Sequence, residues 1–283
     1  MSNTLKYFSV TFAFYIIINI SEKIRDLNHP FRGKGAMKII PLSEGAFSID
    51  QSKVFVPFNK EKDDLQQRAL GSLLVEVQPF VVLTRKDIIL LDTGLGFCNP
   101  DGVLQIHQNL IDVGINPMDV TKVWLSHLHK DHAGGASKED KILNKQFLSF
   151  PQATYYVNRQ ELDFAIDKGK PSYTPEEFIM LREAENVVFV EGNGMIEDNM
   201  RFETTGAHCP YHMALWIEED GEIVFFGADV APQLQQMKSR FVAKYDYDGK
   251  KCMELRTQWW KQAHEEHWTM LFYHDIKTPL IAL

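Results

Sequence analysis

A ten-residue segment, residues 126–135, concentrates side chains that can bind metal ions. Four of them fall within six positions: His127, His129, Asp131 and His132. His127 and His129 stand two apart directly after an apolar stretch, so in an extended chain both side chains point the same way and can share one ion. Asp131 and His132 lie past the strand end, where the chain turns, and can reach a second ion. A single histidine is usually structural, but four such groups at this spacing indicate a metal site.

Four groups do not complete a site for two ions, because a zinc ion takes about four ligands. We expect the missing ligands at the ends of other strands. His208 follows a strand predicted at residues 201–205, and His274 follows another apolar run. Asp229 comes after residues 222–227, which are too apolar to end in an unpaired carboxylate without a reason. These three residues complete the candidate ligand set.

The elements that must position these residues alternate between strands and helices. Runs of β-branched and aromatic residues predict strands at residues 72–84, 87–92, 123–126, 153–157, 201–205, 212–218, 222–227 and 270–273. Helical patterns cover residues 103–113, 159–167, 175–184 and 253–269. The pair Asp220-Gly221 between two apolar runs predicts a hairpin. Strands and helices mixed in this way predict one layered α/β domain.

The N-terminal part of the chain has a different character. Residues 7–20 are an apolar run, too short for a transmembrane helix, which needs about 20 residues. The length suits a signal peptide, but residues 21–25 offer no small-residue cleavage site. We therefore expect residues 1–36 to be a signal or anchor segment or a non-native start, and residues 37–283 to form the domain. Membrane contact is expected only if residues 7–20 are an anchor.

Charge and cysteine content limit the partners and the compartment. The formal net charge of −8 argues against nucleic acid as a partner, because phosphate binding needs clustered lysine and arginine. Three widely spaced cysteines do not suggest a disulfide framework. They fit a reducing compartment, so we expect a cytoplasmic protein, or a secreted or membrane-anchored one if the apolar run is a real targeting segment.

Taken together, the candidate ligands resemble the pattern of the metallo-β-lactamase-fold hydrolases. The HxHxDH motif at residues 127–132 is followed in order by His208, Asp229 and His274, and flanking segments agree with the family at residues 91–94, 206–212 and 226–229. The resemblance covers nearly the whole chain from Met37 onward. It implies an α/β fold, the αββα sandwich, with a site for two metal ions at one edge of two sheets.

The resemblance also implies a role for each ligand. His127, His129 and His208 would hold the first ion; Asp131, His132 and His274 would hold the second; Asp229 would bridge both. Two Zn²⁺ ions are expected, although the same ligands suit Mn, Fe or Co. A hydroxide bridging the ions would attack the substrate, since metals lower the pKa of bound water to about 7 in favourable cases. Asp131 would accept or relay the proton.

Sequence features narrow the expected reaction. His129 stands where the di-iron redox branch would carry a carboxylate, and the segment after Asp229 is too short for a glyoxalase II helical domain. After these exclusions, the members of the family that the chain still resembles are the quorum-quenching lactonases and the methyl-parathion hydrolases. Many such lactonases carry a tyrosine three residues after the bridging aspartate, where this chain has Pro232. We expect hydrolysis of a small-molecule lactone or other ester, with N-acyl-homoserine lactones among the candidates.

Alternative functions and assemblies remain open at this point. One is a phosphotriester or aryl-ester hydrolase of the same fold. Another is a catalytically silent metal-binding scaffold, although all seven ligand positions are filled. The sequence also leaves a homodimer open.

Other residues near the motifs have more ordinary interpretations. Asp92 and His212 are expected to orient ligands, and Cys209 to pack beside His208. The segment 264–267 has two histidines but is one residue short of a zincin motif, so a solvated helix face is expected. His29 and His107 are expected to be structural. Three tryptophans at helical spacing are expected in the core or the pocket lining: Trp259, Trp260 and Trp268.

Overall fold

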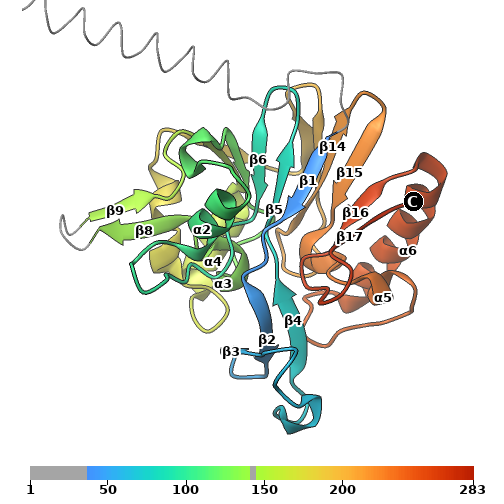
Figure 1. The fold of residues 1–283 in the computed structure, drawn as a ribbon. Coiled ribbons are helices and arrows are strands. Elements are labelled where there is room, and N and C mark those ends of the chain that lie inside the picture. Colours follow the sequence, from blue (N-terminus) through green and yellow to red (C-terminus); the bar gives the residue numbers. More distant parts are fainter. Residues whose placement is uncertain (1–36, 141–144) are drawn as a thin grey trace, which may run out of the picture. The chain divides into compact units, whose positions relative to one another are not determined.

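Two sheets of six strands each form the body of the protein in the computed structural model (Figure 1). The structure describes residues 37–140 and 145–283, so the apolar run at residues 7–20 lies outside the described residues. Within these ranges no helix is long and apolar enough to cross a membrane. Residues Ala36–Leu283 form one compact unit. The assignment of residues 1–36 as a separate extension stays a prediction.

The first sheet combines antiparallel and parallel strands. Its spatial order is β1 (Lys38–Pro41), β5 (Phe80–Leu83), β6 (Ile88–Leu91), β7 (Lys122–Trp124), β10 (Thr154–Asn158) and β11 (Val187–Val190). Strands β1, β5 and β6 pair antiparallel, whereas β6, β7, β10 and β11 pair parallel. The strands β6, β7 and β10 are buried almost throughout, as expected for parallel strands covered on both faces.

The second sheet is mostly antiparallel. Its strands lie in chain order: β12 (Asn193–Ile196), β13 (Met200–Thr204), β14 (Met213–Glu219), β15 (Glu222–Phe226), β16 (Thr269–Leu271) and β17 (Leu280–Ala282). The predicted hairpin joins β14 to β15, and Asp220 and Gly221 both have positive φ, at 51° and 85°. This conformation suits a two-residue hairpin turn, which explains the aspartate–glycine pair.

The core lies between the two sheets. Successive residues of a strand point to opposite faces, so Leu215 and Ile217 belong to this inner core while Trp216 belongs to the cluster on the outer face. Aromatic rings from the two sheets meet across the core: Phe80 lies 6.2 Å from Phe226, measured between ring centroids. The same alternation therefore lets one sheet pack on both of its faces.

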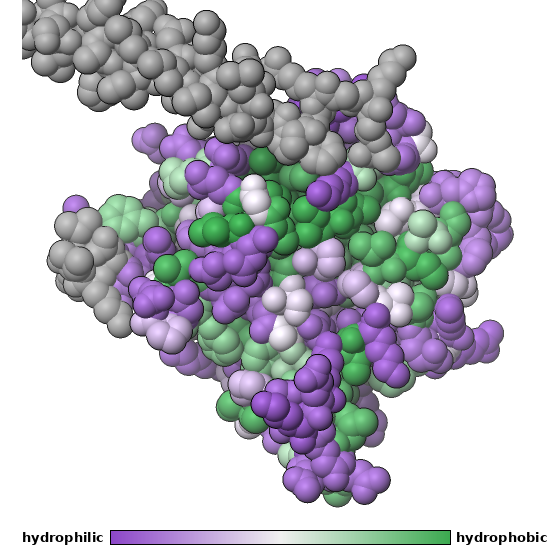
Figure 2. Space-filling model, viewed as in Figure 1, coloured by the Kyte–Doolittle hydropathy of each residue, from purple (hydrophilic) through white to green (hydrophobic). Residues whose placement is uncertain are grey.

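Helices cover the outer face of each sheet. In Figure 1, α2 (Gln105–Asp112) and α4 (Arg159–Lys168) lie outside the first sheet, and α6 (Gly249–Glu266) lies outside the second. The indole of Trp259 on α6 packs 4.8 Å from the ring of Phe225. Figure 2 shows apolar side chains between the layers and hydrophilic ones over α6 and at the bottom of the view. The layer order confirms the expected αββα sandwich.

The remaining elements are short. A three-stranded sheet contains β2 (Gly45–Ile49), β3 (Phe55–Pro57) and β4 (Leu73–Val77), and a hairpin contains β8 (Ser137–Asp140) and β9 (Lys145–Leu148). Two short α-helices are α3 (Lys130–Ala133) and α5 (Leu234–Met237). Five 3-10 turns are η1 (Leu65–Gln67), η2 (Pro117–Asp119), η3 (Pro175–Glu177), η4 (Ile179–Arg182) and η5 (Ala228–Val230).

Two predicted elements differ from the observed ones. The strand expected at residues 72–84 is broken at Pro79, which lacks an amide hydrogen, so β4 and β5 belong to different sheets. The helix expected at residues 175–184 is two 3-10 turns, because Phe178 between them adopts φ −138° and buries its ring fully. Neither change moves a candidate ligand.

Candidate metal centre

The HxHxDH segment leaves the end of β7 and enters the short helix α3. His127 and His132 are fully buried, and Asp131 is nearly so. Backbone hydrogen bonds fix the segment: the Thr93 amide donates to the His132 carbonyl at 2.7 Å, and the Tyr273 hydroxyl donates to the Asp131 carbonyl at 2.6 Å. The segment is therefore held from both sheets, since Thr93 follows β6 and Tyr273 follows β16.

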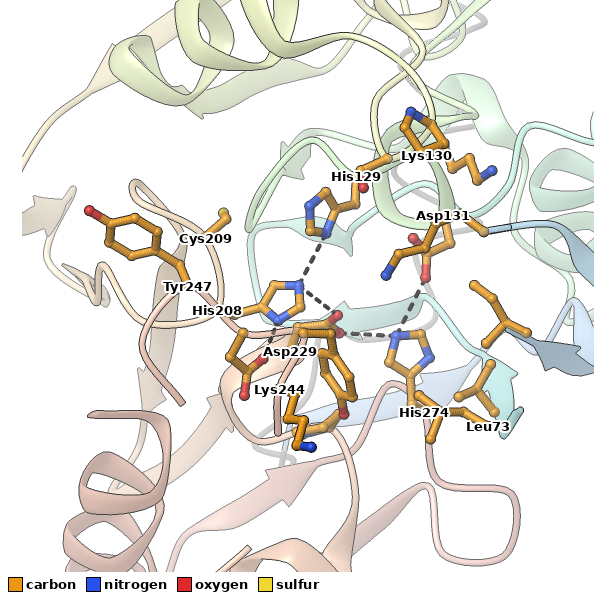
Figure 3. A pocket seen from close by; sticks show the side chains of 18 of the residues that line it. Leu73, His129, Lys130, Asp131, His208, Cys209, Asp229, Lys244, Tyr247 and His274 are labelled. Carbon is orange, nitrogen blue, oxygen red and sulfur yellow. Dashed lines mark hydrogen bonds and ion pairs between the residues drawn. The ribbon is translucent and has the colours of Figure 1, made fainter. Parts of the chain in front are cut away.

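The other three candidate ligands come from the second sheet. His208 lies in the loop between β13 and β14, Asp229 lies in η5 directly after β15, and His274 follows β16. Because these loops leave the same end of the sandwich as the segment after β7, all seven predicted ligands meet. Figure 3 shows five of them: His129, Asp131, His208, Asp229 and His274. Each of these three candidates lies in a segment that follows a strand, and their role as ligands stays a prediction.

Donor atoms of the seven residues form two groups. The first contains His127, His129, His208 and Asp229, and the second contains Asp131, His132 and His274; within each group the donor atoms lie within 4.8 Å of one another. His129 turns Nδ1 inward, 2.9 Å from His127 Nε2 and 3.1 Å from His208 Nε2. This grouping follows the division between two ions that the resemblance implies.

Asp229 stands between the two groups. One carboxylate oxygen, Oδ2, lies 3.1 Å from His208 Nε2. The other oxygen, Oδ1, lies 3.1 Å from His132 Nε2 and 3.0 Å from His274 Nε2. A carboxylate with one oxygen directed at each group has the placement that a bridging ligand requires.

Asp92 orients two of the histidines. Its Oδ2 lies 2.7 Å from His132 Nδ1 and, at the same distance, accepts the hydroxyl hydrogen of Ser126. Because that hydroxyl has already donated its hydrogen, it accepts from His127 Nδ1 at 3.0 Å. Both rings therefore carry hydrogen on Nδ1 and direct Nε2 into the centre. Asp92 adopts a positive φ of 57°, a costly conformation for a non-glycine residue that is often found at functional sites.

His208 and His274 are oriented in the same manner by partners that the sequence did not reveal. Asp246 accepts from His208 Nδ1 at 2.8 Å, and the Glu76 carbonyl accepts from His274 Nδ1 at 2.6 Å. Asp246 lies 38 residues beyond its histidine and has no motif around it. A buried oxygen acceptor behind each imidazole is typical of metal-binding histidines.

Glu161 is a further buried carboxylate that the sequence analysis missed. Its Oε1 accepts the Leu128 amide at 3.1 Å, between His127 and His129, and its Oε2 lies 3.4 Å from Cys209 Sγ. Glu161 thus connects the two loops that carry the first group. Cys209 packs against it beside His208, in agreement with the expected packing role.

The electrostatics differ between the two groups. Burial and neighbouring histidines hold the pKa of His127 and His129 well below the ordinary value, so both are neutral and can donate lone pairs. Burial also opposes charge on His132 and His274, but Asp229 and Asp131 outweigh it and raise both pKa values. Burial would raise the pKa of Asp229, yet the surrounding histidines hold it well below the ordinary value. The carboxylates therefore favour positive charge at the centre.

These residues fit divalent ions on chemical grounds. His132 Nε2 and Asp229 Oδ1 are buried and lie 3.1 Å apart, yet neither forms a hydrogen bond of acceptable geometry among the described residues. The donor set is imidazole nitrogen and carboxylate oxygen without thiolate, which suits Zn and also Mn, Fe or Co. The two groups could therefore bind metal.

A cavity of about 1010 Å³ opens onto the centre. Five of the candidate ligands reach its wall: His129, Asp131, His208, Asp229 and His274. Apolar side chains such as Leu73 and Phe164 line it together with the phenols of Tyr173 and Tyr245. A small organic molecule can therefore approach the side of the centre where Asp131 and Asp229 lie.

Among the described residues, the remaining histidines and the three tryptophans are absent from both donor groups. His212 packs its ring 5.1 Å from that of His127, and its Nδ1 contacts Thr205, but among the described residues no partner bonds its Nε2. His264 contacts the Trp260 carbonyl, and His267 ends α6 with a left-handed conformation. His107 contacts the Ser149 carbonyl, as expected for a structural histidine, and His29 lies outside the described residues. The three tryptophans belong to the outer core around α6.

Comparison with known proteins agrees with this geometry. Residues 75–261 match the family described as the metallo-beta-lactamase superfamily, and no curated protein matches the chain. A probable metal-dependent hydrolase from Staphylococcus aureus has 18% identity and a TM-score of 0.70, with 88% of this chain and 92% of that chain covered.

Two further solved structures share the fold. Hydrolase AbOPH of the beta lactamase superfamily has 20% identity and a TM-score of 0.67, covering 88% of this chain and 91% of that one. AidC, a dizinc quorum-quenching lactonase, has 20% identity and a TM-score of 0.64, covering 87% and 90%. The family match extends over more than half of the sequence, and the chain therefore belongs to the metallo-beta-lactamase superfamily.

Proposed function

We propose that the protein is a hydrolase with two metal ions, zinc by preference, that opens a lactone or cleaves another small ester. The observation that carries this proposal is the position of Asp229, whose two oxygens face the two separate groups of donors. Such a carboxylate would bridge a pair of ions. A closed structural site would instead use one ion and four protein ligands.

Bound ions would supply two chemical effects: a lowered pKa for water and polarisation of the ester carbonyl. The protein side chains perform the remaining work. Asp131 faces the cavity, with Oδ2 3.5 Å from His274 Nε2 and 3.7 Å from His132 Nε2. A carboxylate in this place can take the proton from the attacking water and pass it to the departing alkoxide.

The Tyr245 phenol in the cavity can replace the tyrosine that is absent at Pro232. Its ring lies 6.4 Å from that of His208. Burial raises the pKa of Tyr245, which therefore stays protonated at neutral pH and can donate a hydrogen bond to the substrate carbonyl oxygen. The Tyr173 ring lies 4.7 Å from that of His129, but its hydroxyl is buried beside Glu161 and Cys209.

Relatives of similar fold support a hydrolase. AidC is a dizinc lactonase, and a further structure is an N-acyl homoserine lactone hydrolase with its product N-hexanoyl-L-homoserine at the catalytic metal centre. These names, at 20% and 22% identity, support ester chemistry and motivate the substrate panel below.

The test combines metal content with hydrolysis by the full chain. We expect about two ions per chain by elemental analysis, and turnover of at least one compound in a panel of acyl-homoserine lactones, aryl esters and phosphotriesters. Asp131→Asn should lower kcat by about 100-fold or more, because it removes the proton acceptor, while circular dichroism stays unchanged. His264→Ala, an exposed histidine on α6, is the matched control and should keep both metal and activity.

Three results would contradict parts of this proposal. Less than one ion per chain would exclude the binuclear centre. Two ions without turnover of any panel member would favour a metal-binding scaffold, and turnover of phosphotriesters alone would replace ester by phosphotriester chemistry. Unchanged activity in Asp131→Asn would exclude the role given to Asp131.

A further inference from the structure

The cavity in front of the centre carries a charge opposite to that of the whole protein. Its lining includes five lysines from separate segments: Lys53, Lys130, Lys168, Lys170 and Lys244. Besides the candidate ligands and the Asp246 that bonds His208, Asp50 is the one acidic residue among the described lining residues. The chain as a whole has a net charge of −8. Positive charge is therefore concentrated where a substrate would enter.

Lys53 is one of the residues that line the cavity. It lies between β2 and β3, is half-buried, and has a positive φ of 60°. Its Nζ lies 5.8 Å from the centre of the Tyr245 ring, on the wall that also holds His208. No carboxylate among the described residues forms an ion pair with it. The Lys53 ammonium group therefore lines the cavity of the candidate metal centre without an ion-pair partner among the described residues.

Lys130 places a second charge on the same side of the centre. It stands between two candidate ligands in α3, and Figure 3 shows it and Lys244 on opposite sides of the ligand cluster. Its Nζ lies 5.8 Å from the centre of the Phe55 ring, and it too lacks an ion-pair partner among the residues the structure describes. Burial lowers the pKa of Lys130; the charges of Asp131 and Glu177 oppose this shift, and the charge of Lys53 adds to it.

Aromatic contacts hold both ammonium groups in place without neutralising them. A ring face attracts a cation through its quadrupole but carries no net charge. Two half-buried like charges therefore lie at the cavity wall without an ion pair among the described residues, although Asp131 and Glu177 partly offset the charge of Lys130. An anion would stabilise this arrangement. The remaining three lysines are exposed, and Lys170 pairs with Glu176 at 3.3 Å. Lys53 and Lys130 are therefore the pair that differs from ordinary solvated lysines.

We propose that Lys53 and Lys130 bind an oxyanion group, a carboxylate or a phosphate, that the ester or lactone carries away from the bond to be cleaved. This inference rests on the proposed function and specifies its substrate class. Apolar lining residues such as Leu73, Phe164 and Phe241 would contact the carbon chain that joins the anion to the ester. A neutral acyl lactone would leave both ammonium groups unpaired and would bind more weakly.

Binding of amide analogues tests the proposal without any need for turnover. The metal-loaded full chain is titrated calorimetrically with glutaranilic acid, with 4-phosphonobutyranilide, and with the neutral valeranilide. We expect one of the anionic analogues, or both, to bind at least about tenfold more tightly than valeranilide, as a charge-assisted contact allows. The tighter of the two identifies the preferred oxyanion.

Charge removal assigns this preference to the lysine pair. Lys53→Met should reduce the ratio of anionic-analogue affinity to valeranilide affinity by about tenfold, and should leave valeranilide binding unchanged. Lys86→Met is the matched control, because it removes the same charge at an exposed turn outside the cavity. Lys130→Met should act like Lys53→Met, with metal content measured alongside because of its neighbours. Retention of the anionic preference in Lys53→Met, or an equal loss in Lys86→Met, would overturn the proposal.

The outcomes also separate this inference from the proposed function. Equal binding of neutral and anionic analogues would exclude the anion site even if neutral esters are hydrolysed. A clear anionic preference that depends on Lys53, together with no hydrolysis of 4-nitrophenyl glutarate or of any member of the substrate panel, would support the site and contradict the hydrolase.

Discussion

Glu44 is a single buried carboxylate on which the turn before the metal-binding segment depends. Its Oε2 accepts the Leu95 amide at 2.7 Å, and its Oε1 is buried without a partner among the described residues. Gly94 lies against this carboxylate with φ 74°, where a side chain would collide with it. Burial raises the pKa of Glu44 to about 8; the Leu95 amide opposes this rise and the charge of Asp131 adds to it.

Glu44→Gln should therefore change how stability depends on pH. The folded-state pKa of about 8 lies above the ordinary value of 4.5, so between these values the folded protein holds a proton that the unfolded chain has lost. The free energy of unfolding then falls as pH rises through this window, by at most ~1.4 kcal/mol per pH unit. Glutamine cannot ionise, so the variant lacks this contribution and gains stability relative to wild type from pH 5 to pH 8.

Urea unfolding at pH 5, 6, 7, 8 and 9 measures this difference. Glu254→Gln is the control, because that glutamate is exposed on α6 and should leave the pH profile unchanged. Parallel profiles for wild type and Glu44→Gln would show that Glu44 is not a buried proton-binding group.

Residue types explain which parts of the candidate site could be predicted. Histidine and aspartate at strand ends are rare enough to stand out, and the structure brings all seven together. Their partners Asp246 and Glu161 could not be found, because a carboxylate behind an imidazole or an amide requires no fixed spacing in the chain. Such contacts depend on loops that meet only in the folded protein.

Two glycines show how closely elements must approach to hold the site. Gly96 follows β6, and a side chain there would collide with the carbonyl of Gly134, directly after α3. Gly71 has a similar φ, 78° against 70° for Gly96, but has open space around it. A side chain at either position therefore costs free energy because of the left-handed backbone. Only at Gly96 does it also collide with a neighbouring segment.

Gly96→Ala should destabilise the protein more than Gly71→Ala. Both variants pay about 1 kcal/mol for a left-handed alanine, and only Gly96→Ala must also push the α3 loop away. We expect Gly96→Ala to cost about 3 kcal/mol or more and to lower metal content, whereas Gly71→Ala keeps full metal content. Thermal unfolding and elemental analysis decide this. An equal effect of both substitutions would mean that the loop tolerates displacement.

Sequence periodicity predicts elements well where burial alternates and poorly where packing decides. The hairpin at Asp220-Gly221 was predicted, because turn chemistry and apolar flanks agree. The break at Pro79 and the 3-10 turns around Phe178 were not, since both depend on which neighbouring strand or pocket receives the chain. The sequence of the hairpin formed by β8 and β9 has no clear alternation of apolar and polar residues, because its strands are short and charged.

Segments from both large sheets come together at the candidate centre. The segment after β7 belongs to the first sheet, while His208, Asp229 and His274 belong to the second. Besides the apolar core, ions at this edge would connect the two sheets through bonds that need both of them. Their removal should leave buried carboxylates and imidazoles facing one another without the ions that fit them.

Chelation should therefore lower the melting temperature of the whole domain. A ligand at about 100 times its Kd stabilises the folded state by about 2.7 kcal/mol, so the loss of two such ions should reduce Tm by about 10–20 °C. Scanning calorimetry with and without EDTA measures the shift. His208→Ala removes a donor from the second sheet and should abolish most of it, whereas His264→Ala should keep it in full. Ions that bind ligands from both sheets must stabilise the association of the sheets. A Tm of the wild type that does not respond to chelation would therefore show that the two sheets are held together without metal.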